Sequence, residues 1–92
     1  MPKWEEGKKE ERTSEYLDPS MLSGLQQPAY ILKCLQHGVT EDEIVQIFDG
    51  DKQLVRMWMC FLSHNHWGKQ LSLYDWIATE KGQKAIERYL GV

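Results

Sequence analysis

The segment TEDEIVQIFDGDKQLVRMWMCFL, residues 40–62, decides the fold of this chain. Thr40 followed three residues later by Glu43 is the pattern of a capping box. In this motif the side chain of each residue accepts from the backbone N–H of the other at the start of a helix. The dipeptide at 49–50, Asp-Gly, predicts a turn. A second helix is expected over residues 51–63, with its first residue, an aspartate, as the N-cap. The segment therefore predicts two short helices joined by a tight turn.

The second of these helices is amphipathic. On a helical wheel one face carries large apolar side chains and is predicted to be buried, namely Val55, Trp58, Met59 and Leu62. The opposite face is predicted to be exposed and consists of Gln53, Arg56, Met57, Cys60 and His64. In the first helix the predicted buried residues are Ile44, Ile47 and Phe48.

Two further helices are predicted upstream of the segment. Asp18-Pro19 has the pattern of an N-cap followed by proline at the first helical position, which predicts a short helix reaching Leu25. The next helix is expected to begin at Pro28, with Ile31, Leu32, Cys34 and Leu35 toward the core. Gly38 is placed to end it in the left-handed conformation.

A hairpin and a closing helix are predicted downstream. After Gly68, Leu71 and Leu73 alternate with polar residues, and Trp76 with Ala78 forms a second alternating stretch, so two short strands are expected. Thr79 is the expected cap of the last helix. Its predicted buried residues are Gly82, Ile86, Tyr89 and Leu90.

The composition of the chain fits one small domain. The 92 residues are 27% charged and 41% hydrophobic, which is enough apolar material for a packed core. Residues 1–16 are more than half charged and carry no helical apolar stripe, so we expect a mobile tail followed by a domain over residues 17–92. Trp4 within that tail is either a docking anchor or an incidental aromatic, and the second interpretation is favoured.

Nothing in the sequence predicts a membrane or secretory destination. The longest apolar run, residues 57–62, is far shorter than the roughly 20 residues that span a bilayer. The first residues lack the apolar segment of a signal peptide, and two cysteines cannot form a disulfide scaffold. We therefore expect a cytoplasmic protein that has no membrane partner.

The distribution of charge says more than its sum. The chain carries a net charge of −3, yet residues 52–92 hold six basic side chains against three acidic ones. Residues 17–51 hold one basic side chain against six acidic ones. A folded domain with this distribution can present a positive face to nucleic acid despite its acidic total.

Two parts of the sequence resemble the winged-helix family. Residues 40–62 are similar to the helix-turn-helix of prokaryotic regulators, with Val55 at the position that fills the angle between the two helices. The run WIATEKG, residues 76–82, resembles the segment with which many archaeal and bacterial winged-helix domains leave the wing and enter the last helix. The resemblance implies a mainly α fold with a small β-hairpin, the winged helix-turn-helix.

The same resemblance implies a DNA-binding site. In the family the second helix of the motif enters the major groove, and its outward residues read base edges. Gln53 and Arg56 suit adenine and guanine edges respectively. The implied DNA-binding residues are Lys52, Gln53, Arg56, Met57, Cys60, His64, Lys69 and Lys81. The implied partner is double-stranded DNA, read by a transcriptional regulator that acts as a homodimer because so small a domain buries little surface alone.

Other functions remain as alternatives. A winged-helix module that binds a protein partner instead of DNA would use the soft apolar residues Met57 and Cys60. A metal held by Cys60, His64 and His66 is a weaker interpretation than ordinary surface side chains, since no Cys-x-x-Cys pair accompanies them. We expect no cofactor and no enzymatic activity, because neither a nucleophile elbow nor a phosphate-binding glycine loop is present.

Overall fold

The computed structural model of the protein describes residues 21–73 and 75–91. These residues form four helices and two strands: α1 (Gln26–Gln36), α2 (Glu41–Ile47), α3 (Lys52–His64), β1 (Gly68–Gln70), β2 (Trp76–Ala78) and α4 (Glu80–Leu90). The two strands form an antiparallel sheet in which Lys69 lies opposite Ile77. The protein is thus mainly helical with a small hairpin, and in the described part of the chain no helix has the length and apolar character needed to cross a membrane.

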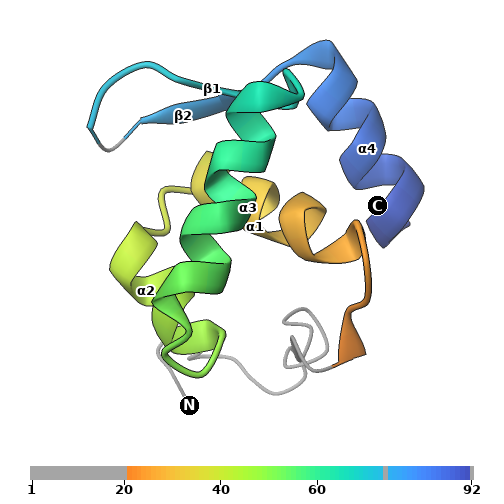
Figure 1. Ribbon diagram of the computed structural model, residues 1–92. Helices are drawn as coiled ribbons and strands as arrows, with labels where there is room; N and C mark the ends of the chain where they lie inside the picture. The colour runs from red at the N-terminus through yellow and green to blue at the C-terminus, as the bar shows by residue number, and fades with distance from the viewer. Residues whose placement is uncertain (1–20, 74, 92) are drawn as a thin grey trace, which may run out of the picture.

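The helix α1 lies at the centre of this arrangement and packs against α2, α3, α4 and β2 (Figure 1). It begins at Gln26, two residues before the predicted start, and Pro28 is accommodated in the first turn, where no intrahelical N–H bond is required. The helix ends as predicted, because Gly38 has φ +84° and Val39 N–H donates to the Cys34 carbonyl.

The short helix expected to reach Leu25 is wrong for the residues that the structure describes. Met21 lies in a 3₁₀ turn, Leu22 and Ser23 are in no helix, and Gly24 has φ +53°, which ends any right-handed helix at that point. Residues 1–20, which include Asp18, the predicted tail and Trp4, lie outside the described residues.

The predicted turn between α2 and α3 is confirmed, and so are both caps. The Thr40 hydroxyl accepts from the Glu43 backbone N–H at 3.2 Å, and the Glu43 carboxylate accepts from the Thr40 N–H at 2.9 Å. The carboxylate of Asp51 accepts from the Leu54 N–H at 3.1 Å. In the turn itself two successive residues are left-handed, Asp49 with φ +59° and Gly50 with φ +80°.

The core is formed by α1 together with one side of each surrounding element. Ile44 and Phe48 of the α2 region are buried as predicted, whereas Ile47 is half-buried. On α3, Val55 and Leu62 are fully buried. The remaining buried apolar side chains include several that the periodicity did not predict, namely Leu22, Ala29, Tyr30, Trp67 and Ala85.

Two residues of the predicted α3 core face, Trp58 and Met59, are only half-buried. The indole N–H of Trp58 donates to the Gln27 side-chain oxygen at 2.9 Å, and its ring meets Phe61 edge to face. This polar partner on α1 holds the tryptophan at the border of the core, where the N–H is satisfied and part of the ring remains in solvent.

The hairpin departs from the predicted strand pattern. Leu71 and Leu73 follow β1 in the connecting loop and are 57% and 74% exposed, so they are not the inward residues of a strand. Trp76 is buried as predicted, but its neighbour Ile77 is 45% exposed. Figure 1 shows the hairpin extending away from the helices, which explains why its far end finds no core to join.

The last helix, α4, is joined tightly to the residues before β1. Thr79 caps α4 by accepting from the Gly82 N–H, and the single proton of the same hydroxyl lies between the carbonyl oxygens of His66 and Trp67, which share it. Gly82 is buried as predicted and lies so close to Trp67 that a Cβ there would overlap the Trp67 carbonyl. Ile86 is buried, whereas Tyr89 and Leu90 are half-buried.

Candidate nucleic-acid interface

The exposed face of α3 is the centre of the candidate site. All five side chains predicted to point outward are exposed, and Met57 is 50% exposed; the five are Gln53, Arg56, Met57, Cys60 and His64. The opposite side of the same helix carries Val55 and Leu62, which are inaccessible to solvent. The capped turn before α3 fixes where this helix begins and therefore which of its residues face outward.

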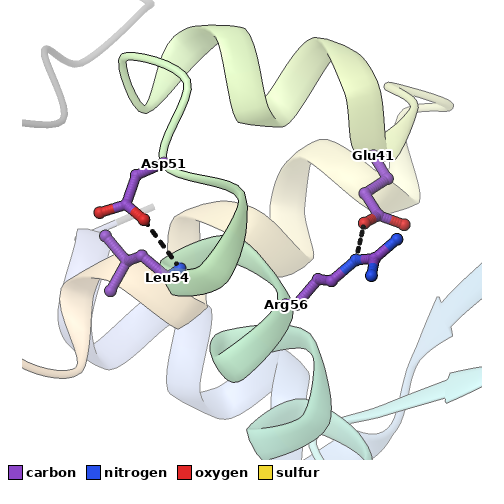
Figure 2. Close-up of polar contacts among 4 residues, drawn as sticks. All are labelled: Glu41, Asp51, Leu54 and Arg56. Carbon is purple, nitrogen blue, oxygen red and sulfur yellow. Dashed lines mark hydrogen bonds and ion pairs between the residues drawn. The ribbon is translucent and has the colours of Figure 1, made fainter.

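Arg56 has a partner that the sequence did not predict. Its Nε–H donates to a carboxylate oxygen of Glu41 at 3.0 Å, and the two side chains are 63% and 35% exposed (Figure 2). Glu41 is the first residue of α2, so the ion pair joins the beginning of that helix to the outer side of α3. An exposed pair of this kind contributes only about 0–1 kcal/mol to folding, so its effect is mainly on the orientation of the two side chains.

The contact with Glu41 uses one part of the guanidinium. The Arg56 Nε takes part in the ion pair, whereas the two Nη groups have no hydrogen-bond partner within residues 21–73 and 75–91. The guanidinium has five N–H donors in a planar fork. The terminal fork, with four of these donors, is therefore unpaired among the described residues, and the side chain that carries it is 63% exposed.

The three lysines predicted to contact DNA lie on different elements. Lys52 begins α3, Lys69 lies in β1, and Lys81 lies in the first turn of α4. All three side chains are exposed, and none forms an ion pair with an acid in the part of the chain that the structure describes. Among the described residues these three lysines on α3, β1 and α4 are therefore without an acidic partner, whereas the fourth predicted cation, Arg56, is paired with Glu41.

A metal site is not assembled from the cysteine and histidines considered in the sequence. Among the described residues no group of three or more His, Cys, Asp or Glu side chains is arranged to hold a metal ion, so Cys60, His64 and His66 are not brought together as ligands. The second cysteine, Cys34, is buried in α1, and this burial raises the pKa of its thiol from 9.0 to about 11. Cys34 is therefore a protonated core side chain, whereas Cys60 is an exposed thiol on the outer face of α3.

Exposed apolar side chains gather on the hairpin. Leu71, Leu73 and Ile77 all leave 45% or more of their surface in solvent. Ile77 lies opposite Lys69 in the sheet, so an apolar and a basic side chain are neighbours there. The sequence pattern predicted that the two leucines lie in a short strand, and it did not predict an exposed side chain at Ile77. The signal that could have corrected this is the small size of the hairpin. Only one predicted helix follows its two strands, so little of the chain remains to bury its apolar side chains.

Comparison of the chain with protein-family models, with curated proteins and with solved structures found no match.

Proposed function

We propose that the protein is a small winged helix-turn-helix DNA-binding protein that reads the major groove with α3 and acts in transcriptional regulation. The observation that carries this proposal is the division of α3 into two faces. The side chains of Val55 and Leu62 are fully buried in the core, while Gln53 and Arg56 lie on the exposed side of the helix and carry donors suited to base edges. The capped α2, the left-handed turn and the following hairpin occur in the order that the winged-helix architecture requires.

The charges around α3 support a role for phosphate contacts beside the base contacts. Lys52, Lys69 and Lys81 are exposed cations without acidic partners among the described residues. In protein–DNA complexes such lysines fix the position of the protein on the backbone, whereas planar side chains in the groove read the sequence. The acidic residues of α2 lie at its N-terminus, where they complement the helix dipole.

The test is a DNA-binding titration with the full chain. A duplex selected from a random library is titrated at two salt concentrations, and the affinity is expected to fall as salt rises because bound phosphates release counterions. Arg56→Ala should lower affinity for the selected duplex by roughly tenfold or more. Lys69→Ala should weaken binding to all duplexes alike and reduce the salt slope by about one.

Both variants should melt close to the parent, since exposed charges contribute little to folding. Absence of any salt-sensitive affinity in the parent would refute DNA binding. Equal affinity of the parent and Arg56→Ala for the selected duplex would remove Arg56 from the reading residues.

A second candidate function is carried by the hairpin. Its three exposed apolar side chains, Leu71, Leu73 and Ile77, suit a protein partner better than a phosphate backbone. In that case the fold would serve as an interaction module that binds another protein. Alternatively, the hairpin would join two copies of this chain in a DNA-binding dimer. Sedimentation of the parent and of Leu73→Ser distinguishes these outcomes: self-association lost in the variant indicates a dimer, and a monomeric parent without DNA affinity favours a separate protein partner.

A further inference from the structure

We infer that Glu41 is a positioning residue, which holds Arg56 so that its terminal fork reads a guanine in the recognised site. This inference deepens the proposed function and depends on it. It assigns a role to a residue on α2 that does not itself touch a base, and it names a G·C pair as part of the target.

The geometry makes Glu41 a well-anchored support. It is the first residue of α2 and lies inside the capping box, between Thr40 and Glu43, which exchange two hydrogen bonds. Its backbone is therefore fixed at the point where the chain enters the helix. From there a carboxylate oxygen accepts from the Arg56 Nε at 3.0 Å across the junction of the two helices (Figure 2).

The choice of Nε determines which donors remain. Guanine presents O6 and N7 as a pair of acceptors in the major groove, and an arginine can meet both with two parallel N–H donors. With Nε already engaged by Glu41, the two Nη groups of Arg56 remain free among the described residues and can meet both acceptors end-on. A carboxylate on Nε also restricts the long side chain before DNA arrives, so less conformational freedom is lost on binding.

Positioning by Glu41 favours binding to the recognised site, whereas its negative charge opposes binding to any DNA. A carboxylate near the DNA surface repels phosphate, so a protein that bound DNA through charge alone would bind better without it. A positioning role therefore predicts two changes in opposite directions when Glu41 is removed. Affinity for unrelated duplexes rises, while discrimination at one base pair falls.

The experiment compares Glu41→Ala, Glu41→Gln and Arg56→Ala, using the duplex selected by the parent and a set of its single-base-pair variants. Arg56→Ala first identifies the base pair that the arginine reads, because discrimination there is lost in that variant. Glu41→Ala should lower discrimination at the same G·C pair by about tenfold, while affinity for unrelated duplexes rises. The double variant should discriminate no less than Arg56→Ala alone, because Glu41 acts only through Arg56.

The matched control is Asp42→Ala. Asp42 is the next residue of the same first turn and an exposed acid, and it makes no ion pair with the described residues. Its removal changes the net charge and the helix terminus in the same way. It should raise affinity for all duplexes while leaving discrimination within about twofold of the parent. Glu41→Gln keeps an oxygen that can accept from Nε without the charge, so its discrimination should fall between those of the parent and Glu41→Ala.

The outcomes separate this inference from the proposed function. If the parent binds DNA and Glu41→Ala discriminates at the arginine's base pair as well as the parent does, the positioning role is wrong and DNA binding stands. An effect of equal size in Asp42→Ala would likewise overturn it, because the cause would then be charge alone. A parent without affinity for DNA would refute both proposals.

Discussion

Replacing Gly82 with alanine is expected to destabilise the protein strongly, although alanine is the better helix former. A Cβ at residue 82 would lie 1.8 Å from the carbonyl oxygen of Trp67 and 2.8 Å from a methyl group of Leu32. The nearer atom belongs to the backbone, so it cannot rotate away. The first turn of α4 would have to retreat by more than 1 Å from the chain between α3 and β1.

That retreat would break a group of hydrogen bonds. The Trp67 carbonyl accepts from the Thr79 N–H at 2.9 Å, the Thr79 hydroxyl shares its proton between the His66 and Trp67 carbonyls, and the same hydroxyl oxygen accepts from the Gly82 N–H. Each such bond contributes about 1 kcal/mol, and the cap about 1 kcal/mol. The higher helix propensity of alanine returns about 1 kcal/mol. With the disturbed packing of Leu32 included, the net loss in the free energy of unfolding is about 3 kcal/mol.

The measurement is thermal and urea denaturation followed by circular dichroism. A loss of about 3 kcal/mol lowers Tm by roughly 12–24 °C in a domain of this size. The matched control is Gly91→Ala at the other end of α4, where φ is +74° and nothing lies within 4 Å of the added Cβ. That change costs only the left-handed conformation, about 1 kcal/mol. A Gly82→Ala protein that melts within about 4 °C of the parent, or above Gly91→Ala, would refute the close packing of α4 on Trp67.

Two further predictions concern the turn and the core. Asp49→Gly should raise the free energy of unfolding by about 0.5 kcal/mol in urea denaturation, because Asp49 has φ +59° and its side chain makes no hydrogen bond or ion pair with the described residues; a lower midpoint would show that the aspartate is required in the turn. Since burial raises the Cys34 pKa from 9.0 to about 11, the unfolded state loses its thiol proton first as pH rises, so the free energy of unfolding should fall between about pH 9 and pH 11. Comparison of denaturation curves with those of Cys34→Ala isolates this slope, and equal slopes in the two proteins would contradict it.

The elements that the sequence predicted best are those whose causes are local. The capping box of Thr40 and Glu43, the Asp51 cap and the left-handed Gly38 each involve residues no more than a turn apart. Their hydrogen bonds form as soon as the helix begins, whatever packs above it. The same is true of Thr79, the predicted cap of the last helix, which accepts from the Gly82 N–H three residues later.

The errors arose where the answer depends on what covers a surface. Alternation predicted a strand through Leu71 and Leu73, but β1 ends at Gln70 and both leucines are exposed, because the surrounding fold decides which part of a short hairpin reaches the core. Trp58 lies on the predicted inward face of α3, yet its indole N–H donates to Gln27 near the start of α1, and the side chain is only half-buried. The sequence pattern shows which face of a helix is apolar, but it does not show how much of that face the neighbouring helix covers.

The sequence predicted which residues of the candidate site are exposed, but it did not predict the ion pair between Arg56 and Glu41. All five outward residues of α3 follow from the helical period, which a single helix determines. The contact of Arg56 with Glu41 joins residues fifteen apart in the chain and depends on the angle at which α2 and α3 cross. Acidic residues in the first turn of α2 are explained by the helix dipole alone. The ion pair of Glu41 with Arg56 could therefore not be predicted from the spacing of residues in the sequence.

The central position of α1 has a consequence for the order in which the chain folds. Its partner α4 comes late in the sequence, and the bond from the Gln26 side chain to the Tyr89 carbonyl spans 63 residues. During synthesis the apolar side of α1 that α4 covers is therefore exposed to solvent after α2, α3 and the hairpin have emerged. Closing so long a loop delays folding more than it weakens the final state. A ribosome-bound chain that stops before residue 80 should accordingly expose this surface to chaperones, and the addition of α4 should end that exposure.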